Sequence, residues 1–179
     1  HLQGIKMNLF ELERKKPILY VDMDGVLADF YGPFNKMAGV SNWSEADRST
    51  VSDVLRKITK MEDFWINLEV LSDVPALMKA IMSLFNGEYI ILSKALAGDP
   101  NVEIQKKQWV NKLPVRPRDT IVIPATADKG RFAVQSNGTP NILIDDFGVN
   151  IKKWQAAGGI GIQHKNGQIN NTIEELRNA

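Results

Sequence analysis

Short, continuous apolar runs alternate with longer amphipathic segments along most of the chain. The runs have no helical period and are bounded by polar or turn residues, which is the pattern of buried β-strands. We predict strands at residues 18–22, 89–92, 120–123, 142–145 and 159–162. Strands that alternate with helical segments indicate a parallel sheet with right-handed crossover connections. The pattern therefore predicts an α/β fold.

Helices are predicted between these strands. The segments that could form them are residues 73–86, 101–113, 129–135 and 149–157. Pro75 is tolerated in the first turn of the first helix, and Asn86-Gly87 is a typical helix end. Each predicted helix lies between two predicted strands, as a parallel sheet requires.

Residues 28–66 interrupt this alternation. The segment is polar and mostly helical in character, and it is too long for a single crossover helix. Ser44 gives a capping signal for one helix that reaches about Lys60. We interpret residues 28–66 as a small helical insertion after the first strand. Residues 1–27 and 67–179 are then the α/β core.

Composition and charge narrow the class of protein. A chain of 179 residues fits one domain with room for a small insertion, and 44% hydrophobic with 24% charged residues indicates a globular protein. The net charge is only +1, so a nucleic-acid polymer is not the expected partner. No apolar stretch approaches about 18 residues, so we expect no membrane span.

The absence of cysteine excludes disulfide and thiolate chemistry. It suits a reducing compartment, and we expect a cytoplasmic protein. The amino-terminal residues HLQGIKM contain no apolar signal core. Because the sequence begins with His, we interpret Met7 as a candidate native start and residues 1–6 as candidate non-native residues.

Two of the predicted strands end in pairs of carboxylates. Asp22 and Asp24 follow the first strand, and Gly25 lets the chain turn so that both acids can serve one centre. Asp145 and Asp146 end the fourth strand. The carboxyl ends of parallel strands are where α/β proteins bind ligands, and four carboxylates there would repel one another without a cation. Mg²⁺ prefers oxygen ligands, so the pattern predicts a Mg²⁺ site.

A plainer interpretation stays open for both pairs. Asp is common in turns and at helix N-termini, so Asp22 and Asp24 could be turn or capping residues. Asp145 and Asp146 could likewise be the first acids of the following helix. We favour the metal site because an acidic pair follows a buried strand twice.

Two motifs resemble those of a known superfamily. DMDGVLADF, at residues 22–30, resembles the first motif of the haloacid-dehalogenase superfamily of phosphotransferases, and Asp145-Asp146 resembles its fourth. Within it, residues 18–162 are similar to the 5'(3')-deoxyribonucleotidase family. The resemblance implies a Rossmann-like core with a central parallel sheet and a small helical cap after the first strand. It also implies Mg²⁺-dependent hydrolysis of a phosphomonoester.

The resemblance implies a role for each acid. Asp22 would attack phosphorus and form an aspartyl-phosphate, while Asp24 would protonate the leaving oxygen and later activate water. Asp24 would also bind the metal through its backbone carbonyl, with Asp146 as a direct ligand and Asp145 supporting it. The dehalogenase branch lacks the second Asp, so carbon–halogen chemistry is not expected.

The phosphate-binding residues follow from weaker motifs. Ser93 resembles the family's phosphoryl-binding hydroxyl, and Lys106, three residues before Trp109, resembles its conserved lysine position. From the residues alone, Ser93 is an ordinary turn residue and Lys106 belongs to a solvated helix face. The neighbouring Lys107 is expected in solvent. Further candidates for contact with substrate are Gly25, Lys94 and Lys129.

Aromatic residues supply the candidates for a base-binding pocket. Phe30, Phe64 and Trp65 could stack on a nucleobase, or they could be the core of the helical insertion. Trp43 is interpreted as core of the insertion and His164 as a loop residue without a chemical role. The sequence departs from the family at Leu92, where Thr is common, and in residues 124–140, which leaves the base and sugar preference open.

The expected partner is a small phosphomonoester, most simply a nucleoside monophosphate. Two alternatives stay open. A sugar phosphate or another small phosphomonoester would keep the chemistry, whereas a metal- or nucleotide-binding module would keep only the fold. A homodimer also stays open.

Overall fold

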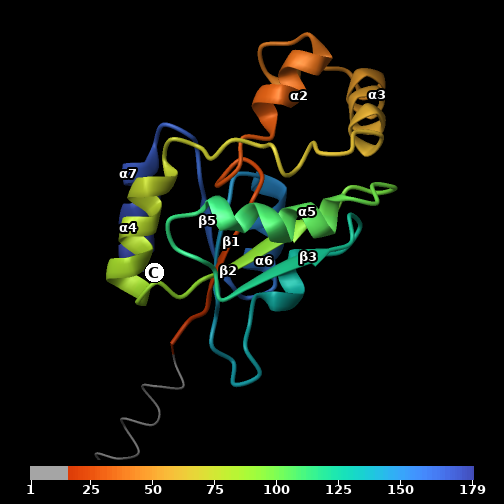
Figure 1. The fold of residues 1–179 in the computed structure, drawn as a ribbon. Coiled ribbons are helices and arrows are strands. Elements are labelled where there is room, and N and C mark those ends of the chain that lie inside the picture. Colours follow the sequence, from red (N-terminus) through yellow and green to blue (C-terminus); the bar gives the residue numbers. More distant parts are fainter. Residues whose placement is uncertain (1–15) are drawn as a thin grey trace, which may run out of the picture.

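A parallel sheet forms the centre of residues 16–179, the part of the chain that this computed structural model describes (Figure 1). Its strands are β1 (Leu19–Val21), β2 (Ile90–Lys94), β3 (Asp119–Ile123), β4 (Ile142–Asp145) and β5 (Ile160–Gln163). They lie in the order β3-β2-β1-β4-β5, and every neighbouring pair is parallel. The predicted α/β fold is confirmed. Met7 lies outside the described residues.

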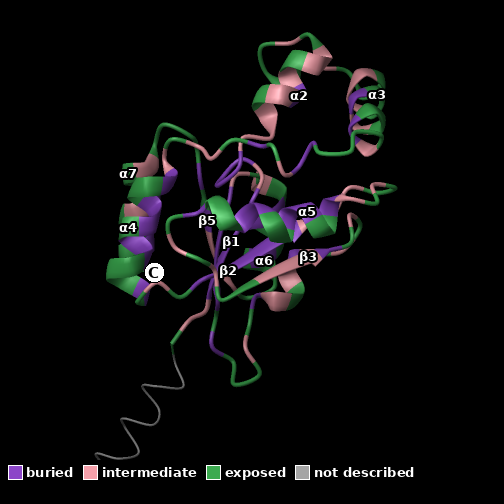
Figure 2. Cartoon of the chain, viewed as in Figure 1, coloured by how far each residue is buried: buried purple, intermediate pink, exposed green. Residues whose placement is uncertain are grey.

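Helices pack on both faces of the sheet. They are α4 (Val74–Phe85), α5 (Val102–Trp109) and α7 (Ile169–Asn178) on one face, and α6 (Gly148–Ala156) with the 3-10 turn η3 (Lys129–Phe132) on the other. Successive side chains of a strand point to opposite faces. Leu19 and Val21 therefore enter the first core, and Tyr20 enters the second. Figure 2 shows the buried residues gathered along the sheet and on the helix sides that face it.

Helical elements lie between β1 and α4, where a helical insertion was predicted. It contains α2 (Tyr31–Ala38), the 3-10 turn η1 (Trp43–Glu45) and α3 (Arg48–Thr59). Figure 1 shows these helices beyond the carboxyl ends of the strands. The two connections to the core run side by side, because Asp29 donates its N–H to the Glu69 carbonyl at 2.8 Å and Leu71 donates to Leu27 at 2.9 Å.

Several element boundaries differ from the predictions. The single helix predicted from Ser44 is instead η1 followed by a separate α3. Asp47 caps α3 by accepting a hydrogen bond from the Thr50 N–H at 2.7 Å. The helix predicted over 129–135 is only the short η3, and a further 3-10 turn, η2 (Val110–Lys112), ends α5.

The sequence pattern did not predict α7. This helix packs against α4 and buries Thr172 and Leu176. His164 follows β5 in a loop, as predicted, but it is buried against α7: it is 1% exposed and lies 2.7 Å, Nδ1 to Oγ1, from Thr172. No helix within residues 16–179 combines the length and the apolar character needed to cross a membrane.

Candidate active site

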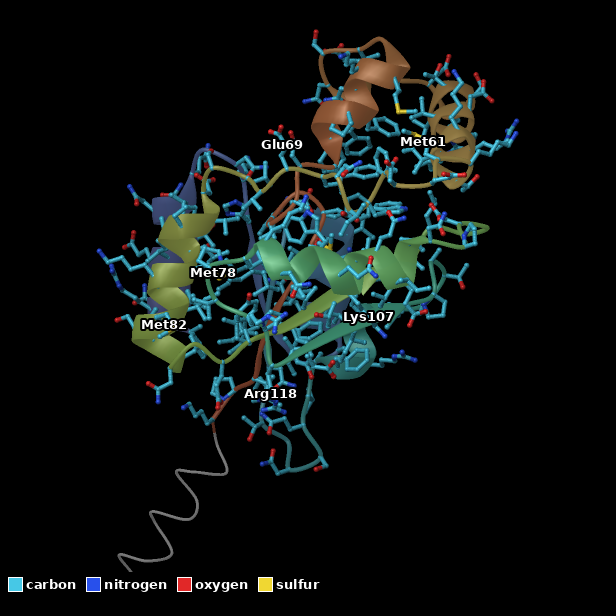
Figure 3. All side chains as sticks on the ribbon, in the orientation of Figure 1. Met61, Glu69, Met78, Met82, Lys107 and Arg118 are labelled. Carbon is cyan, nitrogen blue, oxygen red and sulfur yellow. The ribbon has the colours of Figure 1, made fainter. Side chains whose placement is uncertain are left out.

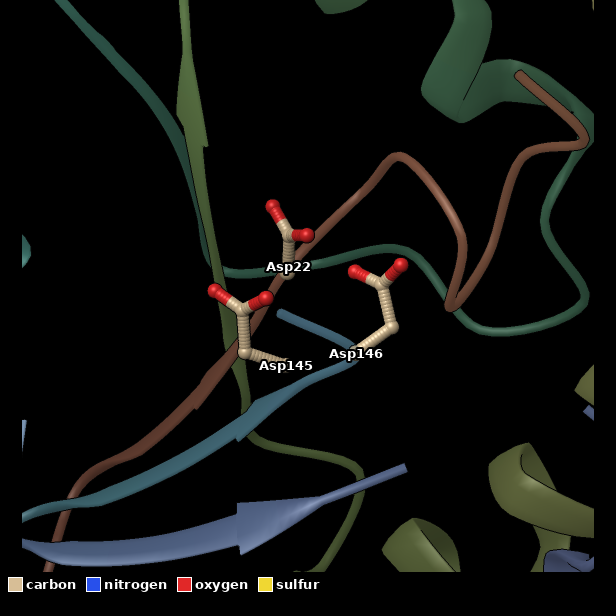
Figure 4. A group of neighbouring side chains, drawn as sticks. All are labelled: Asp22, Asp145 and Asp146. Carbon is tan, nitrogen blue, oxygen red and sulfur yellow. The ribbon is translucent and has the colours of Figure 1, made fainter. Parts of the chain in front are cut away.

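Three carboxylates converge at the carboxyl ends of the central strands β1 and β4 (Figure 4). Asp22 follows β1, Asp145 ends β4, and Asp146 comes next in the chain. One oxygen of each lies within 4.8 Å of the other two. The chain runs from β1 to β2 and β3 on one side and then crosses to β4 on the other, so the carboxylates lie at the topological switch point of the sheet.

Gly25 allows the chain after β1 to pass close to this cluster. Its φ is +83°, a left-handed conformation that favours glycine. A Cβ at this position would lie 2.3 Å from Oδ2 of Asp146. The Asn166 side chain donates to the Gly25 carbonyl at 3.2 Å and helps to fix the turn. Gly25 therefore makes room for the Asp146 carboxylate.

Lys129 lies among the carboxylates. Its Nζ donates to Oδ1 of Asp22 and to Oδ2 of Asp145, both at 2.8 Å, and the side chain is 2% exposed. Burial opposes the charge on this lysine, but the two carboxylates outweigh it and raise the pKa of Lys129 above its ordinary value. The lysine therefore stays protonated and holds Asp22 and Asp145 in fixed orientations.

Lys106 is fully buried on the other side of β1. From α5 its Nζ donates to Oδ2 of Asp24 at 2.8 Å, to Oγ of Ser93 at 2.7 Å and to the carbonyl of Lys94 at 2.8 Å. It also lies 4.7 Å from the centre of the Trp65 ring, a cation–π contact. The structure thus brings Asp24, Ser93 and Lys106 together, but Asp24 faces this lysine and not the three-carboxylate cluster.

Helix geometry explains why only one of the two adjacent lysines of α5, Lys106 and Lys107, faces the site. Neighbouring residues of a helix are about 100° apart around its axis. Lys107 is exposed and pairs with Glu103 at 3.1 Å, and Figure 3 shows it on the outer side of α5. The structure thus brings Lys106, and not Lys107, beside Asp24 and Ser93.

The carboxylates raise one another's proton affinity. Burial, and then the charge of Asp145, raises the pKa of Asp22 well above its ordinary value, with Lys129 opposing the shift. Burial and Asp145 raise the pKa of Asp146 to about 7. The donor set consists of oxygen atoms, which suits a hard divalent cation such as Mg²⁺. A cation bound there would replace protons as the source of positive charge.

A pocket of about 290 Å³ opens over the cluster. Its lining residues are Asp22, Asp24, Tyr31, Trp43, Lys94, Lys129, Asp146, Phe147 and Asn150. Four of these were not predicted as site residues. Tyr31 and Trp43 come from the insertion, and Phe147 and Asn150 come from the start of α6. The proximity of Phe147 and Asn150 to the Asp145-Asp146 motif was a signal that could have found them.

The aromatic residues differ from the predictions. Trp43 is 42% exposed and stacks on Tyr31 at 6.1 Å, so its interpretation as core of the insertion is wrong. Phe64 and Trp65 are buried, and Phe30 stacks on Trp65 at 5.7 Å. These three rings belong to the hydrophobic core and do not line the pocket over the carboxylates. The structure therefore agrees with the alternative interpretation of them as core residues.

Comparison with known proteins adds a fold relationship. No protein-family model matches the sequence, and no curated protein is similar enough in sequence to match it. The structure is similar to a hydrolase from Streptococcus pneumoniae TIGR4, with a TM-score of 0.52 and 14% identity over 92% of this chain and 100% of that one. The two chains share a fold. The structure is also similar to a haloacid dehalogenase-like family hydrolase from Xanthomonas campestris, with a TM-score of 0.55 and 10% identity over 92% and 91% of the two chains.

Proposed function

We propose that this protein is a Mg²⁺-dependent phosphomonoesterase that forms an aspartyl-phosphate on Asp22. The observation that carries the proposal is the cluster of Asp22, Asp145 and Asp146 at the switch point of the sheet. One buried lysine, Lys129, pairs with Asp22, and another, Lys106, pairs with Asp24. The fold shared with two hydrolases supports the proposal. The resemblance of the two acidic motifs to those of phosphotransferases supports it as well.

The cation would be held by Asp22 and Asp146, with Asp145 in support, and when bound it would neutralise charge on the phosphoryl oxygens. The chain itself supplies the rest of the chemistry. Lys129 orients Asp22, whose carboxylate oxygen forms a bond to phosphorus while the bond from phosphorus to the ester oxygen breaks. Water then attacks the phosphorus of the aspartyl-phosphate, which releases phosphate and regenerates the Asp22 carboxylate.

Asp24 is the proposed acid and base. Its Oδ2 accepts a hydrogen bond from Lys106, whereas its Oδ1 is buried and has no hydrogen-bond partner among residues 16–179. A buried polar atom without a partner is costly, and a proton shared with the leaving oxygen or with the attacking water would remove that cost. Asp24 would give its proton to the leaving oxygen and take one from the water in the second step.

A nucleoside monophosphate is the proposed substrate. Tyr31, Trp43 and Phe147 line the pocket, and Trp43 and Phe147 are 42% and 40% exposed. Exposed aromatic rings beside a charged site are suited to stacking on a nucleobase while the phosphate lies at the carboxylates. The volume, about 290 Å³, is at the small end of the range for small-molecule sites, which favours a mononucleotide over a polymer.

A substrate panel tests this function. Phosphate release from nucleoside 5'-monophosphates, sugar phosphates and p-nitrophenyl phosphate is measured with Mg²⁺ and with EDTA. We expect turnover only with Mg²⁺ and the highest kcat/KM with nucleotides. Equal efficiency with sugar phosphates would contradict the nucleotide assignment, and full activity in EDTA would contradict the metal requirement.

A further inference from the structure

Lys94 differs from the other two lysines around the carboxylates. Lys106 pairs with Asp24, and Lys129 pairs with Asp22 and Asp145. Lys94 is half-buried, and its ammonium group has no ion pair or hydrogen bond within the described residues. It nevertheless lines the same pocket. This positive charge at the site is therefore not neutralised by the protein.

The side chain of Lys94 lies on the opposite face of β2 from Ser93. Successive strand residues alternate between faces, and the β2 residues on either side of Ile91 belong to the core under α6. Ser93 contacts Lys106 on the α5 side. Lys94 therefore projects toward η3 and α6, where it shares the pocket with Phe147 and Asn150.

Both positive and negative groups surround Lys94. The groups that act on it are the ammoniums of Lys129 and Lys153 and the carboxylates of Asp128 and Asp145. Asp145 is already bound by Lys129, and Asp128 accepts a hydrogen bond from the Gly130 N–H at 2.7 Å. Burial, followed by the two neighbouring ammoniums, lowers the pKa of Lys94, so its surroundings do not compensate the charge.

We propose that Lys94 binds a second anionic group of the substrate, separate from the phosphoryl group that reacts at Asp22. This inference rests on the proposed phosphatase function and refines its substrate class. Asp22 lines the same pocket, but the charged neighbours of Lys94 include Lys153 of α6 and Asp128, the N-cap of η3, so Lys94 extends to the α6 end of that pocket. Among the phosphomonoesters that the site accepts, Lys94 would then favour those that carry a second phosphate or a carboxylate over those with a single charged group, so that a nucleotide with a second anion would be preferred to the simple nucleoside monophosphate.

Matched substrates separate the two sources of the second anion. Comparing a nucleoside 3',5'-bisphosphate with the corresponding 5'-monophosphate tests whether the second anion is a phosphate. Comparing 3-phosphoglycerate with glycerol 3-phosphate tests whether the second anion is a carboxylate, because the first compound carries a carboxylate where the second carries a hydroxymethyl group. p-Nitrophenyl phosphate carries no second anion. The wild-type protein should prefer one of the doubly charged compounds over its singly charged partner.

Substitutions at Lys94 then test the residue itself. Lys94→Gln removes the charge but keeps the backbone carbonyl that Lys106 binds, and Lys94→Arg keeps the charge. A hydrogen-bonded charge pair contributes about 10–100-fold in affinity. We expect Lys94→Gln to raise KM for the preferred doubly charged substrate about 10-fold more than for its partner, and Lys94→Arg to restore most of the preference. Lys107→Gln, an exposed lysine outside the site, should change neither value.

Calorimetric binding of the same compounds with Mg²⁺ gives a readout that does not depend on turnover. If the wild-type protein hydrolyses none of these compounds, the proposed phosphatase function is wrong. A loss of binding in Lys94→Gln that is selective for the doubly charged compound would still support the anion subsite. An equal effect of Lys94→Gln on all substrates would assign the lysine to the reacting phosphoryl group and overturn the inference. So would no preference for a second anion in either kinetics or binding.

Discussion

Asp22 and Asp24 stand two residues apart, but the fold gives their carboxylates different partners. Lys129 holds Asp22 beside two further acids, and Lys106 holds Asp24 on the other side of β1. Identical side chains can take different roles when their surroundings differ. At this scale the proposed division between nucleophile and acid depends on which lysine each carboxylate contacts.

Substitution of each acid should separate the two roles. Asp22→Asn should abolish turnover of every ester, because an amide is a poor nucleophile. Asp24→Asn should lose about 10²–10⁴-fold with nucleotides, because it removes the proton donor. p-Nitrophenolate leaves without protonation, so Asp24→Asn should retain a burst of nitrophenol that Asp22→Asn lacks, measured by single-turnover absorbance. A burst in Asp22→Asn alone would reverse the roles.

The Trp43 ring should decide affinity for the base and not for the phosphate. Stacking on an aromatic side chain contributes about 1–3 kcal/mol per base. Trp43→Ala should therefore raise KM for nucleotides about 5–150-fold. p-Nitrophenyl phosphate also has a ring that could stack, whereas glycerol 3-phosphate has none, so KM for glycerol 3-phosphate reports only on binding of the phosphate. Ile104→Ala, which shortens an exposed apolar residue outside the pocket, is the control. An equal rise in KM for glycerol 3-phosphate would count against stacking.

At the scale of elements, the strands and their terminal acids could be predicted from sequence, because both depend on local pattern. The acids of β1 and β4 follow apolar runs whose parallel pairing is a general rule of α/β folds. The exposure of Trp43 and the burial of Trp65 could not be predicted, since both depend on how the insertion packs against the core. Ser44 and Asp47 are both plausible N-caps, and only the three-dimensional structure selects Asp47.

The turn after β1 offers a test of how an element positions the site. Gly25→Ala should displace Asp146, because its Cβ would lie 2.3 Å from that carboxylate. We expect the Mg²⁺ concentration for half-maximal activity to rise at least about 10-fold, as when a residue that positions a metal ligand is changed. Gly39→Ala is the matched control, since Gly39 also has a positive φ, +69°, but no atom within 4 Å of the Cβ position. If both variants change the Mg²⁺ requirement equally, backbone strain alone explains the effect.

On the scale of the whole molecule, the site lies where the chain reverses its direction of travel across the sheet. The core supplies Asp22, Lys129 and Asp146, and the insertion supplies Tyr31 and Trp43 over them. Chemistry and base recognition would thus come from separate parts of the chain. The charge cluster should also matter to global stability, because the folded state brings its carboxylates together and the unfolded state separates them.

The last prediction concerns the pH dependence of stabilisation by Mg²⁺. Without a cation, the raised pKa values of Asp22 and Asp146 mean that the folded state binds more protons than the unfolded state above about pH 4. The free energy of unfolding should therefore fall as the pH rises toward about 7, where Asp146 loses its proton.

Bound Mg²⁺ replaces those protons, so its stabilising effect should be larger at pH 8 than at pH 5.5. At 100 times its Kd, Mg²⁺ should contribute about 2.7 kcal/mol, or roughly 5–11 °C in Tm. Thermal unfolding with Mg²⁺ and with EDTA at the two pH values measures this difference. Asp146→Asn should remove most of it, and Asp119→Asn, an exposed acid at the start of β3, should leave it unchanged. An equal Mg²⁺ effect at both pH values would mean that the cation does not bind at the carboxylate cluster.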